Sequence, residues 1–170
     1  MVKAKVGCSV KTLLCEQLDL CPDYLEKRIQ TIFLDGKPVD DVHSATVKQE
    51  STLALSAALP GLIGATLRRG GYYAPMRDQI SHRECTTSEP LQEGIVFLKL
   101  FNLLLKELGP AFLKKGVWIN REDLSDFFRG QPDDFWAGCK AARVDGEKFD
   151  LDKLLDIRWA ERYVFLKLKT

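Results

Sequence analysis

The residues best suited to chemistry lie in one glycine-rich stretch, LPGLIGATLRRGGYY, at positions 59–73. Backbone N–H groups are exposed at glycines, and together with the guanidinium groups of Arg68 and Arg69 they can bind an anion. The stretch lacks the glycine-lysine-serine/threonine of a P-loop and the strand and helix context of a dinucleotide-binding glycine motif. We therefore expect first a bend with an exposed basic and aromatic surface, and second an anion-binding loop.

The predicted binding surface is segment 61–83, which contacts either a protein or an anionic small ligand. In the anion version, arginines supply the charge and glycines allow the backbone to approach the ligand closely. In the protein version, tyrosine and arginine side chains form the kind of contact that dominates binding hot spots. The candidate ligand-binding residues are Arg68, Arg69, Gly70, Gly71, Tyr72, Tyr73 and Arg77.

Catalytic and metal-binding patterns are not evident. His43 and His82 are the only histidines, and neither has the spacing of a Ser/His/Asp, Cys/His or HExxH site. Cys8, Cys15 and Cys21 do not follow the C-x4-C-x2-C spacing of plant-type iron–sulfur proteins. We expect no catalytic residue, metal site or cofactor, and favour a non-enzymatic function.

Composition points to an ordinary globular protein, because 45% of the 170 residues are hydrophobic and 29% are charged. The net charge of +1 gives no argument for a nucleic-acid or membrane partner. The odd number of cysteines and the missing secretory leader favour the cytoplasm. The longest apolar run, 94–108, contains Lys99, Asn102 and Lys106 and is shorter than the ~20 residues of a membrane span. We expect it to be a core helix.

Alternating apolar residues predict strands at 2–6, 29–35 and 51–59. The pair Asp35-Gly36 predicts a two-residue hairpin turn after the second of these strands. The N-terminal part is thus expected to be a small sheet with a helix that follows the first strand.

A polar stretch at 72–89 is the expected joint between two halves. The second half is expected to begin with a long helix capped by Ser88 and ended by Gly109-Pro110. The further elements predicted are a strand at 116–119, a helix capped by Asn120, a hairpin at Asp145-Gly146, a helix capped by Asp150 and a strand at 162–169.

The segments IQTIFLDGKPVDD, ATVKQESTLALSAALPG and LRRGG give residues 2–71 a resemblance to β-grasp domains, the fold of ubiquitin and the small sulfur carriers. The resemblance implies a hairpin before a deep-core strand that leads into a diglycine. Such carriers use the terminal carboxylate of the second glycine. Gly71 is followed here by Tyr72 and the whole second half, so carrier chemistry would require cleavage after Gly71.

Residues 92–150 resemble a winged helix-turn-helix module, in which DDFWAGCKAA at 133–142 would form a recognition helix. Asp133 and Asp134 would then place carboxylates where DNA readers place donors and cations, which disfavours nucleic acid. Lys140 and Arg143 lie at the other end of this stretch.

The sequence therefore predicts an α+β protein. A β-grasp-like half at 1–71, a joint at 72–89 and a helix-centred α+β half at 90–170 form either two domains or one continuous body. The favoured function is a non-enzymatic binding or assembly module. The alternatives are a winged-helix regulator on nucleic acid and a small enzyme with a site between the halves. No membrane partner is expected, and the oligomeric state stays open.

Overall fold

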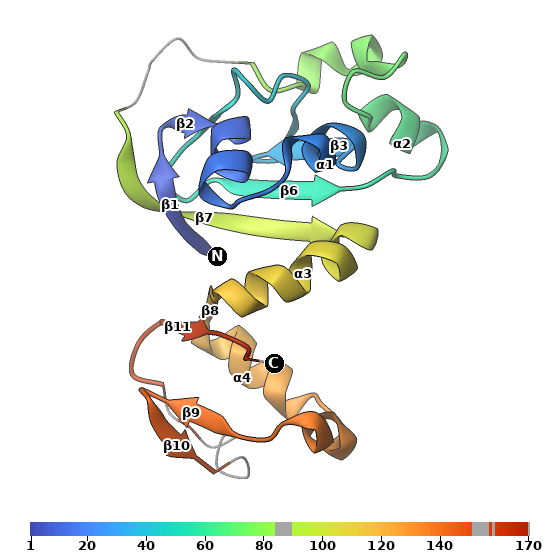
Figure 1. Cartoon of the computed structure of the whole chain (residues 1–170). Helices are drawn as coiled ribbons and strands as arrows, with labels where there is room; N and C mark the ends of the chain where they lie inside the picture. Colours follow the sequence, from blue (N-terminus) through green and yellow to red (C-terminus); the bar gives the residue numbers. More distant parts are fainter. Residues whose placement is uncertain (84–89, 151–156, 158, 170) are drawn as a thin grey trace. The chain divides into compact units, whose positions relative to one another are not determined.

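The chain is α+β and consists of two compact units (Figure 1). The computed structural model describes residues 1–83, 90–150, 157 and 159–169. The first unit is Met1–Lys115 with Leu168–Thr170, and the second is Gly116–Lys167. This division does not coincide with the joint expected at 72–89.

The first unit is built on one five-stranded sheet in the order β1-β7-β6-β3-β4. Neighbouring strands are antiparallel except β6 and β7, which are parallel. A short pair, β2 with β5, accompanies the sheet. The elements are β1 (Val2–Val6), β2 (Cys8–Ser9), the π-helix η1 (Thr12–Gln17), α1 (Pro22–Lys27), β3 (Thr31–Leu34), β4 (Lys37–Pro38), β5 (Thr46–Val47), β6 (Thr52–Ser56), α2 (Gly61–Leu67), the 3-10 helix η2 (Ala74–Ile80), β7 (Gln92–Phe101) and α3 (Leu103–Lys115).

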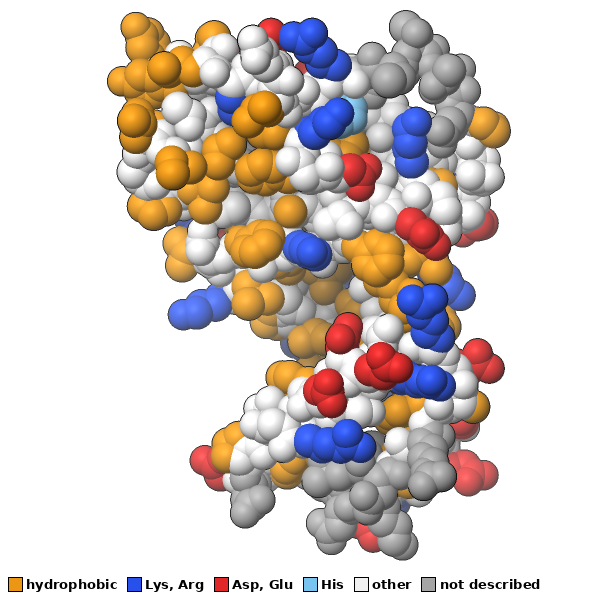
Figure 2. Space-filling view, turned by 180° about the vertical axis from the view of Figure 1, so that it is seen from behind, with side chains coloured by type: hydrophobic (Ala, Val, Ile, Leu, Met, Phe, Trp, Pro, Cys, Tyr) orange, Lys and Arg blue, Asp and Glu red, His pale blue; other side chains and the backbone are white. Residues whose placement is uncertain are grey.

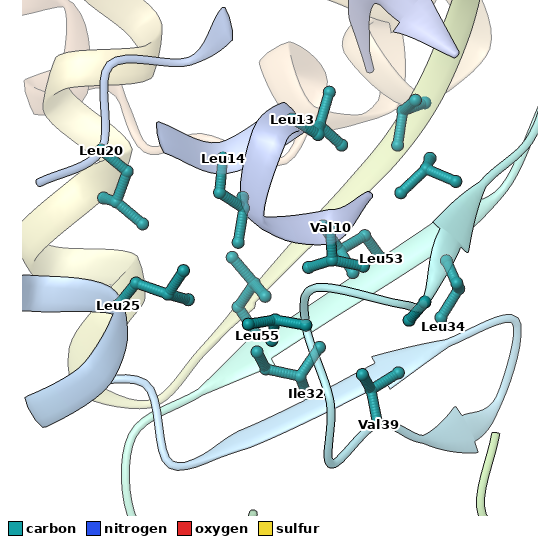
Figure 3. Close-up of a cluster of buried hydrophobic side chains, with 14 of the residues drawn as sticks. Val10, Leu13, Leu14, Leu20, Leu25, Ile32, Leu34, Val39, Leu53 and Leu55 are labelled. Carbon is teal, nitrogen blue, oxygen red and sulfur yellow. The ribbon is translucent and has the colours of Figure 1, made fainter. Parts of the chain in front are cut away.

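One face of this sheet forms the main core. Alternate side chains of the strands pack there against η1 and α1, as the period of two in a strand requires. The buried side chains in Figure 3 come from these helices and the residues next to them, from the strands and from the β4–β5 connection: Val10, Leu13, Leu14, Leu20, Leu25, Ile32, Leu34, Val39, Leu53 and Leu55. The side chains between these alternate positions point to the opposite face of the sheet.

The prediction of a long core helix over 94–108 is wrong for its first half. Residues 92–101 form β7, which pairs with both β1 and β6, and the helix α3 begins only at Leu103. The end predicted at Gly109-Pro110 is also wrong, because α3 continues through Pro110 to Lys115. Apolar side chains occupy both faces of this central strand, so a period of two could not be distinguished from a buried helix. Asn102 has φ = 54° and separates the strand from the helix.

Local turn signals are confirmed. Asp35 and Gly36 both have positive φ values, 51° and 79°, and join β3 to β4 as a two-residue hairpin. Asp145 and Gly146 do the same between β9 (Ala142–Val144) and β10 (Glu147–Phe149), with φ values of 50° and 89°. Asn120 caps α4 (Arg121–Arg129), because its side chain accepts a hydrogen bond from the Glu122 N–H at 2.8 Å.

The second unit is a small α+β body with its own apolar cluster. Leu124 and Phe128 are its buried centre, and Trp136 and Trp159 pack against them. Strand β11 pairs with β8, and β9 pairs with β10. Its elements are β8 (Val117–Asn120), α4 (Arg121–Arg129), the 3-10 helix η3 (Asp133–Gly138), β9 (Ala142–Val144), β10 (Glu147–Phe149) and β11 (Tyr163–Leu166).

The prediction of a recognition helix at 133–142 is wrong. Only Asp133–Gly138 is helical, as a 3-10 helix of six residues, and the chain then enters β9. The helix ends at Gly138, and glycine is a poor helix former. The helix that Asp150 was expected to cap falls mainly on residues outside the described part of the chain.

An ion pair joins α3 to α1 in the first unit. Tyr24 Oη donates to Glu107 Oε2 at 2.5 Å, and Arg28 Nε donates to the same oxygen at 3.0 Å. The hydrogen bonds from Arg28 and then Tyr24 lower the pKa of Glu107 to about 2. Burial, and then the hydrogen bond to Glu107, raise the pKa of Tyr24 to about 12.

This ion pair makes stability depend on acidity. The pKa of Glu107 is lower in the folded protein than in the unfolded chain, so its contribution is present above about pH 4.5 and lost as pH falls toward 2. Glu107→Gln should therefore lower the unfolding midpoint of the first unit at neutral pH. The difference between the midpoints of wild type and Glu107→Gln should become smaller as the pH falls toward 2.

Denaturant unfolding at several pH values measures this effect, with the exposed Glu50→Gln as the matched control. A difference between wild type and Glu107→Gln that stays constant from neutral pH to pH ~2 would contradict the role of the carboxylate.

Candidate functional site

The stretch predicted as a bend begins with a helix. Residues Gly61–Leu67 form α2, which starts after the extended residue Pro60, and Gly61 has φ = 72°. Gly64 is buried where the helix meets the preceding chain. A Cβ atom built on Gly64 would lie 1.9 Å from the carbonyl oxygen of Leu59, so only glycine fits this contact.

Arg77 is the centre of segment 61–83. Its side chain is buried and forms a two-pronged ion pair with Asp40, with nitrogen–oxygen distances of 2.9 and 2.7 Å. Its Nε donates to the Thr66 carbonyl oxygen at 2.6 Å, and its Nη1 donates to Ser81 Oγ at 2.7 Å. One arginine thus ties the end of α2, the end of η2 and the chain after β4 together.

Arg69 and Gly70 extend this anchor. The Gly70 N–H donates to the same Asp40 carboxylate at 3.2 Å. Arg69 Nη2 donates to the Leu25 carbonyl oxygen at 3.2 Å and to Glu26 at 3.0 Å, and its backbone N–H donates to the Gln30 carbonyl oxygen at 2.7 Å. The groups expected to hold a foreign anion therefore hold carboxylates and carbonyls of this chain.

The remaining candidate residues face solvent or lie in the turn. Gly71 is half-buried, and its N–H closes a turn onto the Arg68 carbonyl oxygen at 3.1 Å. Arg68 is exposed and forms no ion pair with any residue that the structure describes. Tyr72 is 90% exposed, and its ring meets that of Tyr73 edge to face, with 5.1 Å between the ring centroids.

Large apolar side chains surround these residues. We call this set the α2–η2 surface, because its members lie on α2, on η2 and on the turn between them. Figure 2 shows hydrophobic side chains gathered over the corner of the first unit that carries these two helices. The exposed members are Leu62, Ile63, Tyr72, Tyr73, Met76 and Ile80.

Sequence reasoning missed two parts of this site. Asp40 lies 37 residues before Arg77, so no local spacing could pair them. Leu62, Ile63 and Met76 are apolar, and residues of these types are usually buried, but here the three are between 69% and 76% exposed.

Other kinds of site find little support in the described residues. Within them, no group of three or more His, Cys, Asp or Glu side chains could hold a metal ion. The backbone N–H of His82 donates to the Pro38 carbonyl oxygen at 2.7 Å, and the backbone N–H of His43 donates to the Asp41 side chain at 2.9 Å. No helix in the described part of the chain has the length and apolar character needed to cross a membrane.

None of the protein families, curated proteins or solved structures compared with the chain matches it. The resemblance of residues 2–71 to β-grasp domains therefore stays a prediction. The strand beside β1 in the sheet, β7, also lies outside those residues.

The anchoring role of Arg77 predicts a large stability effect. Arg77→Gln should destabilise the first unit by about 3 kcal/mol, the low end for breaking a buried ion pair, because the Asp40 side chain is 40% exposed. Arg83→Gln is the matched control: the Arg83–Asp78 pair lies in the same segment but is 70% exposed on both sides. Its loss should cost less than about 1 kcal/mol.

Urea denaturation followed through the amide signals of β6 measures this difference, since all three tryptophans lie in the second unit. Equal losses in the two variants would contradict the anchor.

The contact at Gly64 predicts that alanine is tolerated less well at this position than at another helical glycine. Gly64→Ala should lower stability by about 1–3 kcal/mol, because the overlap with the Leu59 carbonyl outweighs the helix propensity of alanine. Gly109→Ala in α3 is the control, since its Cβ would meet only Leu105 Cδ1 at 3.7 Å. That change should alter stability by less than about 1 kcal/mol, because the helix propensity of alanine is offset by Pro110, which disfavours a Cβ on the preceding helical residue. Thermal unfolding that ranks the two variants in the opposite order would refute this packing.

Proposed function

We propose that the protein is a non-enzymatic binding module whose α2–η2 surface contacts a protein partner. The observation that carries the proposal is the exposure of large apolar side chains on a segment that is held in place by a buried ion pair. Leu62, Ile63 and Met76 are each at least 69% exposed, and Tyr72 is 90% exposed. Contiguous apolar surface of this kind is typical of interaction sites.

The charges near this surface favour a protein over a small anion. Arg77 and Arg69 are neutralised by Asp40 and Glu26, and Gly70 donates to Asp40. Binding an anion there would require displacement of these internal carboxylates. Arg68 is left as an exposed cation beside the tyrosines, so the partner surface we expect is apolar with an acidic residue at its rim.

The edge strands of the main sheet are less suited to partner binding than the α2–η2 surface. At the β1 edge, the Gln17 side chain accepts from the Lys5 N–H at 2.7 Å and donates to the Lys5 carbonyl oxygen at 2.9 Å. At the β4 edge, the Pro38 carbonyl oxygen accepts from the His82 N–H. Backbone groups that are already satisfied favour side-chain docking over the addition of a partner strand.

A photo-crosslinking amino acid placed at Tyr72 tests the proposal in cells that make the protein. It should give an adduct of discrete mass with one protein, and Ile63→Lys in the same chain should remove most of that adduct. Ile63 is 73% exposed, so this change should leave the fold intact. The control position is Lys106, which is exposed on α3.

An equal adduct pattern from positions 72 and 106, or an adduct indifferent to Ile63→Lys, would contradict a protein site here. The anion alternative has its own readout, which is thermal stabilisation by nucleotides or inorganic phosphate that Arg68→Ala removes. That result would replace the protein partner with an anionic ligand.

A further inference from the structure

The face of the main sheet opposite the core carries a hollow of about 600 Å³. It lies over β3, β6 and β7, and the β3–β4 turn and the start of α3 border it. Its size falls within the range of small-molecule sites, about 300–1,000 Å³. Figure 2 views the first unit from the side away from η1 and α1 and shows apolar and basic side chains interspersed there.

The hollow follows from the side chains of β6. Leu53 and Leu55 point into the core, so Thr52, Ala54 and Ser56 point to the other face. These outward side chains are small, although the strand lies inside the sheet between β7 and β3.

Larger side chains on the neighbouring strands form the walls. The register places Ala54 between Phe33 and Lys99, and Ser56 is paired with Phe101 on β7. Leu59 adds a further apolar wall beyond the end of β6. A low central strip between two aromatic side chains is a shape that an elongated apolar group can fill.

The hollow has two charged side chains, Asp35 and Lys99, and of these only Asp35 has hydrogen-bond partners among the described residues. Asp35 accepts from Ser51 Oγ at 2.9 Å and from the Thr52 N–H at 2.7 Å. Asn102 Nδ2 donates to Ser56 Oγ at 3.1 Å. Lys99 is exposed and forms no ion pair with any residue in the described part of the chain.

From this arrangement we infer that the hollow binds a small apolar monocarboxylate, with the carboxylate at Lys99 and the apolar body over Ala54 between Phe33 and Phe101. This site is separate from the α2–η2 surface and does not depend on the proposed function. One lysine matches a single negative charge, whereas the Asp35 carboxylate on the wall opposes a polyanion such as a nucleotide. The apolar walls would contribute most of the affinity through burial of the ligand body.

Phenylbutyrate and phenylbutanol are suitable probes, because they share one body and differ in charge. Titrations of the full-length protein followed by amide NMR should show phenylbutyrate binding with a Kd of about 1 mM or tighter, as a ligand of this size allows. The shifted amides should include those of Ala54, Lys99 and Phe101. Phenylbutanol should bind about fivefold more weakly, the factor that about 1 kcal/mol for a partly exposed ion pair corresponds to.

Two variants locate the site. Lys99→Met should bring phenylbutyrate down to the affinity of phenylbutanol, while Lys106→Met, an exposed lysine outside the hollow, should change neither. Ala54→Trp should fill the hollow and reduce binding of both probes at least tenfold. The unbound amide spectrum shows whether that variant is folded, and Ala54→Phe replaces it if it is not.

Three results with the wild-type protein would overturn the inference: no shifts at these amides with millimolar phenylbutyrate, equal affinity for the two probes, or AMP binding more tightly than phenylbutyrate. Undiminished binding to a folded variant with the hollow filled would equally overturn it.

Discussion

The buried ion pair between Arg77 and Asp40 is the constraint on which the candidate surface depends. A guanidinium group this deeply buried is stable only with a paired carboxylate and satisfied N–H groups, and both conditions are met here. The pair holds α2 and η2 against the chain after β4, with several of their apolar side chains exposed to solvent. The apolar side chains of α2 and η2 are therefore presented on an anchored segment.

The parts of the fold that the sequence predicted are those set by local chemistry. Asp35-Gly36 and Asp145-Gly146 formed the expected hairpins because few other residue pairs tolerate positive φ at both positions. Asn120 capped its helix for a similarly local reason. Strand β7 was missed because apolar side chains on both of its faces hide the period that separates strands from helices, and only its pairing with β1 and β6 shows that it is a strand.

In the candidate site, too, the features set by local sequence were predictable and those set by the tertiary fold were not. The exposure of Arg68 and Tyr72 agrees with the expected basic and aromatic surface. The inward direction of Arg69 and Arg77 could not be predicted, because their carboxylate partners, Glu26 and Asp40, are brought close only by the tertiary fold. The hollow over β6 had a readable signal, the small outward residues of STLALS, but its walls come from strands far away in the sequence.

The most direct test of the account is amide hydrogen exchange in the isolated, full-length protein at the N–H groups that anchor segment 61–83. The backbone N–H groups of Arg69, Gly70 and His82 donate to Gln30, Asp40 and Pro38, respectively. If the segment is a fixed platform, these amides should exchange far more slowly than the exposed chain, and Arg77→Gln should accelerate all three together. Exchange at the rate of an unstructured peptide in wild type would contradict the claim that the α2–η2 surface is held in place.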